Sequence, residues 1–268
     1  MRKLSVIAAG LLGLVAVGAE AAQPSDWQSK FSLDVKNKFV SENVRRGRRE
    51  GQKGFKSKVN FGYEIFDSVK VGLGVDSSLT LRNDKGDIVA PYFDISYDAS
   101  EMFTLEAGYL HNFHSKLDPR NGNTPLGVRR NTNEIFCGVN ADVLLSPSLF
   151  IFYDFDRRET AIEGKVGYNF DLSQYAISGL GVDFGAKLGF DSSKKPYGKK
   201  HVAADGKKGY CYYGANADLT YAINSNAKAK IGVAYDGSSA KKTSWTGNLS
   251  GHKHKNFVWF NASIDCSF

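Results

Sequence analysis

Charged side chains recur at every second position along much of the chain, and this spacing is the feature that could do chemistry. Lys36 and Lys38 alternate with apolar residues, and Lys56 and Lys58 do the same in the next such segment. Residues two apart in a strand point to the same side, so each segment would carry one charged face and one apolar face. Fixed charges in a row orient ions and polar solutes electrostatically.

If the turns between neighbouring strands are placed at particular residues, opposite charges come to lie across from one another. A turn near Arg49 would put Glu42 opposite Lys56, and a turn at Asn224 would put Asp218 opposite Lys230. We predict a charged pore lining, with the alternative that the pairs only neutralise one another in a narrow, filled interior. The predicted lining residues are Lys36, Lys38, Glu42, Lys56, Lys58, Glu64, Asp76, Glu106, Asp183, Lys187, Asp218, Lys228 and Lys230.

Basic residues also gather in four segments that we predict to be long surface loops. These segments, 44–54, 115–131, 192–209 and 237–254, are rich in Gly, Lys and Arg. A basic rim could concentrate anionic solutes or bind the phosphates of lipopolysaccharide. The predicted extracellular rim consists of Arg45, Arg46, Arg48, Arg49, Arg129, Arg130, Lys199 and Lys200.

Catalytic chemistry finds little support in the sequence. His111 and His114 lie near Ser115, but adjacent residues of a strand point to opposite faces, and no motif of nucleophile and base surrounds them. His252 and His254 could ligate a metal, although two histidines are a weak pattern for a metal site. We predict that the protein is not an enzyme and has no catalytic residues, no metal and no cofactor.

The amino end predicts export. A basic start and an apolar run from Leu4 to Val17 lead to small residues ending at Ala21, which is the pattern of a cleaved secretory signal peptide. The remaining sequence contains no apolar stretch long enough for a membrane helix. We predict a signal peptide at 1–21 and one barrel domain at 22–268.

Twelve segments of the predicted mature chain alternate with period two, and most reach the length of a tilted membrane strand. In a bilayer every backbone polar group needs a partner, so spanning strands must close into a barrel. We predict an all-β fold, a transmembrane antiparallel up-and-down β-barrel of about 12 strands. A soluble barrel with its apolar phase inward is the alternative. The segments are 28–43, 55–66, 69–81, 88–98, 103–113, 134–143, 149–155, 161–172, 180–191, 210–221, 227–236 and 255–268.

Connections between these segments mostly alternate in length. Short ones, which in such barrels face the periplasm, alternate with long ones, which face outward; the short connection 156–160 breaks the alternation. The last segment ends flush on Phe268 and must pair with 31–39 to close the barrel. Its terminal aromatic residue resembles the segment by which the barrel assembly machinery recognises bacterial outer-membrane barrels, so Phe268 is the predicted membrane-assembly signal.

The combination of several features resembles a known class. The signal peptide, Val40-Ser41 followed by Val44, Arg46 and Gly47, and the terminal Phe268 resemble TorF-type porins and similar small outer-membrane families. The resemblance implies a bacterial outer-membrane β-barrel of the small porin class.

The predicted function is passive diffusion of small polar or ionic solutes, with anions favoured at the mouth. The alternatives are a closed structural or surface-binding barrel that contacts lipopolysaccharide or host molecules and, less favoured, an outer-membrane hydrolase. Expected partners are outer-membrane lipid and lipopolysaccharide, the barrel assembly machinery and small polar solutes; the oligomeric state stays open. The net charge of +7 would permit nucleic acid as a partner, but we expect none for an exported barrel.

Overall fold

The computed structural model describes residues 30–46, 48–81, 87–114, 131–175, 177–192, 209–239 and 256–268. Within these ranges the chain forms twelve strands, and no helix there is long and apolar enough to cross a membrane. The strands are β1 Phe31–Arg45, β2 Arg48–Phe66, β3 Val69–Thr80, β4 Ile88–Ser100, β5 Phe103–His114, β6 Thr132–Ala141, β7 Ser148–Asp154, β8 Glu159–Asp171, β9 Leu180–Asp191, β10 Tyr210–Ala222, β11 Ala227–Ser238 and β12 Asn256–Ser267.

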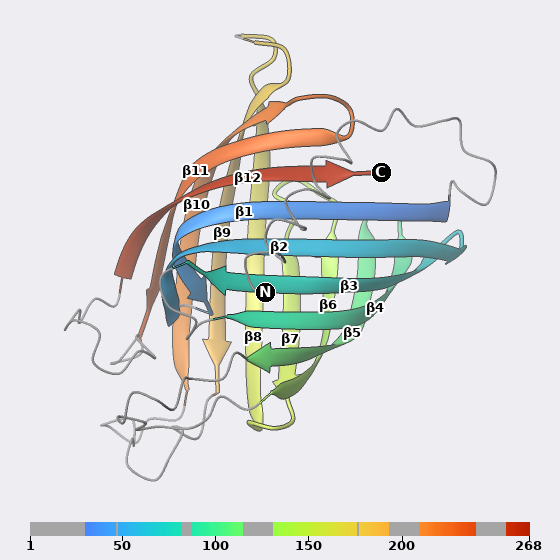
Figure 1. Cartoon of the computed structure of the whole chain (residues 1–268). Helices are drawn as coiled ribbons and strands as arrows, with labels where there is room; N and C mark the ends of the chain where they lie inside the picture. The colour runs from blue at the N-terminus through green and yellow to red at the C-terminus, as the bar shows by residue number, and fades with distance from the viewer. Residues whose placement is uncertain are drawn as a thin grey trace.

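The strands form one closed antiparallel barrel in which each strand pairs with its neighbours in sequence (Figure 1). β12 closes the ring on β1, with a register running from Asp34 opposite Ser267 to Val40 opposite Asn261. Because the first strand pairs with the last, every described strand has a neighbour on each side and none is an edge strand. The predicted twelve-stranded barrel and its closure by the last strand are therefore confirmed.

The outer face of the barrel is apolar. Leu73, Leu188 and Phe260 are 61%, 65% and 65% exposed, and each lies on the outward phase of its strand. Exposed aromatic residues lie near both ends of the strands, as in the interfacial girdles of membrane barrels. This arrangement suits lipid outside the barrel, and it excludes the soluble alternative with its apolar phase inward.

The two ends of the barrel differ in their connections. One end, here called the turn end, carries the connections β2–β3, β4–β5, β6–β7, β8–β9 and β10–β11, together with the end of β12. The opposite end, here called the loop end, carries the connections β1–β2, β3–β4, β5–β6, β7–β8, β9–β10 and β11–β12. The predicted long loops 115–131, 192–209 and 237–254 connect strands at the loop end, and most of their residues lie outside the described ranges.

The first hairpin differs from the prediction. The segment 44–54 was predicted to be a long loop, but β1 continues to Arg45 and β2 begins at Arg48. Arg46 has a positive φ of 47°, and Arg45 pairs directly with Arg48, so the chain reverses within a short β-hairpin connection. Asn43 pairs with Gly51 and Val44 pairs with Arg49, so the register shift places the extra residue of a β-bulge, Glu50, on β2. Bulges bend the strand that carries them.

Both predicted cross-strand pairs of opposite charge are wrong. Because the first turn falls at Arg46 and not near Arg49, Glu42 lies opposite Gln52 and Lys56 lies opposite Lys38. In the β10–β11 hairpin the turn falls later than Asn224, so the two strands shift relative to each other. Asp218 therefore lies opposite Gly232, and Lys230 lies opposite Thr220.

Candidate functional site

The inner face of the barrel carries the charges. All predicted lining residues lie on the strand phase opposite the apolar outer face. Lys230 illustrates how they meet: its Nζ lies 3.1 Å from Asp183 on β9 and 3.2 Å from Asp265 on β12. On the same wall, Lys187 Nζ lies 2.7 Å from Asp236 on β11. Ion pairs therefore link strands across the inner surface.

Lysines of β1 and β2 form two rungs of like charge. Lys36 lies opposite Lys58, and Lys38 lies opposite Lys56. Like charges directly opposite each other are destabilising, but Lys36 has Asp265 of β12 opposite it on its other side, and Lys58 has Asp76 of β3. Lys36, Lys58 and the neighbouring Asp76 are exposed although they face inward, so solvent reaches the inner face at this level.

At the loop end a segment of the first hairpin crosses the barrel. This segment, Asn43–Arg46, is called the hairpin tip below. Arg46 Nη2 lies 2.9 Å from Glu134 Oε1 on β6, while β6 and β7 stand opposite β1 in the ring of strands. Only a hairpin that bends inward can make this contact, and the β2 bulge opposite Asn43 and Val44 supplies the bend.

Four residues of the opposite wall surround Arg46, and together they are called the Arg46 site: Glu134, Phe152, Asp191 and Tyr210. The carboxylate of Glu134 is 2% exposed, and the Arg46 guanidinium carbon lies 4.7 Å from the centre of the Phe152 ring. The Tyr210 hydroxyl lies 3.0 Å from the Arg46 carbonyl oxygen and 3.1 Å from Asp191 Oδ2. The hairpin tip is thus held through both its side chain and its backbone.

Electrostatics favour a charged Arg46 in this position. Burial by itself would lower the pKa of this turn residue, but the carboxylates of Glu134 and Asp191 outweigh burial and raise the Arg46 pKa above its ordinary value. Removing one partner of a buried ion pair strongly destabilises the protein, because the other charge stays buried without compensation.

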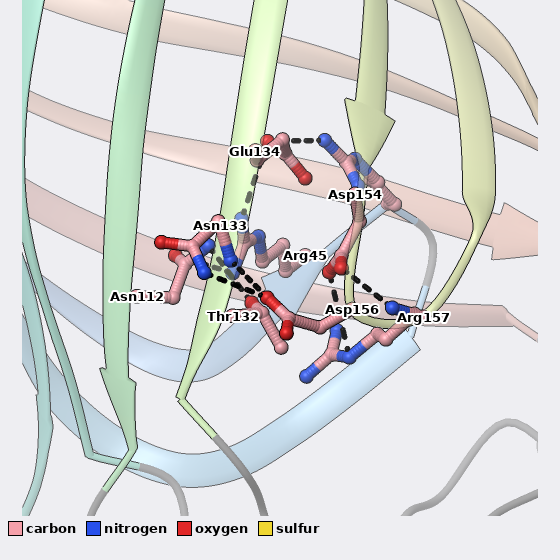
Figure 2. Close-up of polar contacts among 9 residues, drawn as sticks. Arg45, Asn112, Thr132, Asn133, Glu134, Asp154, Asp156 and Arg157 are labelled. Carbon is pink, nitrogen blue, oxygen red and sulfur yellow. Dashed lines mark hydrogen bonds and ion pairs between the residues drawn. The ribbon is translucent and has the colours of Figure 1, made fainter.

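Arg45 attaches the hairpin tip at a second point. Figure 2 shows Arg45 reaching toward Asn112 and Glu134, at 3.4 Å and 3.8 Å. Asn112 in turn donates a hydrogen bond to the Thr132 hydroxyl. Beside this contact, Arg157 lies 3.6 Å from Asp154 in the turn between β7 and β8. These contacts brace the wall against which the tip rests.

On the side of β11 and β12, apolar contacts hold the base of the hairpin tip. Val40 and Val44 form a buried cluster with Ala234 and Trp259 inside the barrel. The Trp259 indole donates a hydrogen bond of 2.6 Å to Asp236. Burying these valines against an aromatic ring stabilises the inward position of the hairpin.

Sequence reasoning missed the hairpin tip and the Arg46 site, although a pattern pointed to both. Val40 and Trp259 are apolar residues on the polar phase of their strands, and so is Phe152 on β7. An apolar residue on the inner phase of a barrel needs a partner inside it, since water would otherwise surround it. These residues indicate where the interior is filled.

The predicted extracellular rim needs a correction at two positions. Arg45 and Arg46 turn inward and pair with Glu134, because the bulged hairpin carries them into the barrel. The side chains of Arg48 and Arg49 lie outside the described part of the structure. The other predicted rim residues lie outside the described ranges altogether, namely Arg129, Arg130, Lys199 and Lys200.

The residues considered for catalysis are only partly described. His111 faces Asn133, with 2.7 Å between His111 Nδ1 and Asn133 Oδ1. The side chain of His114 and the whole of Ser115 lie outside the described part, as do His252 and His254. Among the residues that the structure describes, no group of His, Cys, Asp and Glu could hold a metal ion.

Comparison with solved structures finds outer-membrane proteins of similar fold. No family model and no curated protein matches the sequence. The NanC porin is 12% identical, covering 88% of this chain and 98% of its own, with a TM-score of 0.46. An outer-membrane channel from Pseudomonas putida F1 is 10% identical; the alignment covers 92% of this chain and 100% of the channel, with a TM-score of 0.49. LpxR from Salmonella typhimurium is 11% identical, covering 88% and 99%, with a TM-score of 0.49.

The fold assignment rests on the strand pairing of this chain itself. Membership in the TorF-type porins stays a prediction.

Proposed function

We propose that the protein is a bacterial outer-membrane channel through which small polar or ionic solutes diffuse. The observation that carries the proposal is the pairing of an apolar outer face with a charged inner face in one closed barrel. Inward-facing Lys36, Lys58 and Asp76 are exposed to solvent, as a water-filled lumen requires.

We also propose that the hairpin tip gates this channel. Solutes that enter from the loop end meet Arg46 and Glu134 joined across the barrel. Conduction therefore requires the hairpin tip to leave its docked position or to leave a narrow passage beside it. We expect low conductance at rest and discrete openings.

The docked hairpin tip also supports an alternative function, that of a closed barrel. A barrel that is permanently closed by the contact between Arg46 and Glu134 would serve as a structural or surface-binding protein. Its basic loops would then contact lipopolysaccharide or host molecules. Electrical recording separates the two functions, because only the channel passes current.

The test is conductance of the refolded full-length protein in planar bilayers. The proposal predicts discrete current steps in a potassium chloride solution, and folded protein that inserts without any steps would refute it. A heat-modifiable shift in gel mobility shows that the barrel has folded before each recording.

Ion preference is measured in the same preparation by the reversal potential in a salt gradient. We propose that the lysine rungs favour anions, because they place four positive charges on one wall. Reversing these charges to glutamate should then move the reversal potential toward cations, and an unchanged potential would locate selectivity elsewhere. The four positions are Lys36, Lys38, Lys56 and Lys58.

A further inference from the structure

The Arg46 site is complete without the hairpin that occupies it. Glu134 lies on β6, Phe152 on β7, Asp191 on β9 and Tyr210 on β10, so the site belongs to the wall opposite β1 and β2. The hairpin tip contributes only the group that is bound. Arg46 therefore occupies the site as a tethered ligand would.

The chemistry of the site selects a guanidinium group. Glu134 accepts a hydrogen bond from the guanidinium at 2.9 Å, and the ring of Phe152 lies against the guanidinium at 4.7 Å. A planar guanidinium can stack on an aromatic ring while donating to a carboxylate, whereas a compact ammonium is more strongly hydrated and does not stack. Asp191 adds a second negative charge nearby.

The docked site holds two carboxylates that a cation must compensate. Glu134 and Asp191 are both nearly fully buried, at 2% and 4% exposed. A buried carboxylate without a positive partner is costly, so withdrawing Arg46 alone is opposed. A second guanidinium that entered the site would compensate these charges and lower the cost of releasing the hairpin tip.

We propose that the Arg46 site is a binding site for guanidinium-bearing solutes, which displace Arg46 and release the hairpin tip from the mouth of the barrel. The gating step of this inference rests on the proposed channel function, whereas the binding step does not. The bound solute takes the place of the Arg46 side chain between Glu134 and Phe152. The hairpin then swings about the β2 bulge that lies opposite Asn43 and Val44.

Direct binding to a variant with an empty site tests the proposal. The probe is methylguanidinium chloride, titrated by calorimetry into the full-length Arg46→Ala protein in detergent. We expect this variant to bind at least about tenfold more tightly than the double variant Arg46→Ala with Glu134→Gln, since the latter lacks a charge-assisted hydrogen bond. Methylammonium chloride should bind the Arg46→Ala protein more weakly than methylguanidinium. Equal affinity of the single and double variants would overturn the proposal.

A matched control uses an ion pair elsewhere on the inner face. Lys165 lies 2.8 Å from Glu163 and is 52% exposed, and both residues of this pair belong to β8. The Lys165→Ala variant should bind methylguanidinium no better than the unaltered protein. Comparable gains in Lys165→Ala and Arg46→Ala would mean that any unpaired carboxylate suffices, and the proposed site would be refuted.

A measurement on the protein with Arg46 intact keeps the proposal testable if Arg46→Ala fails to fold. Replacing Trp27 and Trp245 by phenylalanine leaves Trp259, which packs against Val40 and Val44, as the single fluorescent reporter. Methylguanidinium should shift the Trp259 emission, and potassium chloride at equal ionic strength should not. An unshifted emission would refute displacement of the hairpin tip.

The outcomes separate this inference from the channel proposal. Binding of methylguanidinium in a protein that never conducts would refute the channel and leave the binding site standing. Discrete conductance together with no difference between the single and double variants would refute the binding site and leave the channel standing.

Discussion

Replacing Arg46 by alanine should convert the resting barrel into an open one. The change removes the 2.9 Å contact with Glu134 and the 4.7 Å contact with the Phe152 ring. A hydrogen bond between charged groups contributes about 1.5–3 kcal/mol. A desolvated cation–π contact contributes about 1–2 kcal/mol. Arg45, at 3.8 Å from Glu134, can replace part of the loss.

The summed loss shifts the equilibrium of the hairpin tip. About 2.5–5 kcal/mol corresponds to a change of roughly 60- to 4,000-fold toward the undocked position. Because Arg45 compensates in part, we expect a value near the lower bound. The undocked hairpin no longer crosses the loop end, so the fraction of time in the conducting state should rise.

Single-channel recording measures that fraction directly. The Arg46→Ala protein should show an open fraction at least about tenfold above that of the unaltered protein, or remain open throughout. The Lys165→Ala variant removes an ion pair of the same lumen that does not involve the hairpin, and its open fraction should not change. An open fraction that is the same in Arg46→Ala and the unaltered protein would show that the hairpin tip does not limit conduction.

Three further predictions concern the barrel itself. Leu188→Arg, at an outward position that is 65% exposed, should destabilise the barrel by about 2–4 kcal/mol in urea unfolding from lipid vesicles, and an unchanged midpoint would argue against lipid at this face. Phe268→Ser should lower the amount of heat-modifiable protein in the outer membrane of cells, whereas normal amounts would remove Phe268 from assembly. Gly189→Ala would press a methyl group against the hydroxyl end of the buried Tyr212 side chain and should cost about 1–3 kcal/mol, while Gly167→Ala, which meets nothing closer than 3.6 Å, should leave the unfolding midpoint in place.

The strands were predictable because their pattern depends only on neighbours in the chain. Alternation with period two follows from the geometry of an extended backbone, and one apolar face on each of twelve segments requires a closed barrel once lipid lies outside. The flush end at Phe268 likewise led to the pairing of β12 with β1, which the structure contains. Most predicted segments therefore coincide with strands.

The registers were less accessible to sequence reasoning. A turn that shifts by one residue changes the partner of every residue in the hairpin by two positions, and two turn positions were assumed incorrectly. The reversal of the chain at Arg46 was missed because a run of arginines and glycines has the composition of a loop. Its strand conformation depends on contacts with β6 and β10 that are remote in sequence.

The sequence by itself determined the class of this protein: an alternating chain with an apolar face outward, a charged face inward and a closing strand that ends on Phe268. These properties are local and repeat along the chain, so the alternation can be recognised in each strand separately. Only the tertiary structure decided that Arg46 belongs to the interior. Its partners Glu134 and Asp191 lie far along the chain, and a bulge of one residue, which leaves no clear trace in the alternation, directs the hairpin across the barrel to meet them.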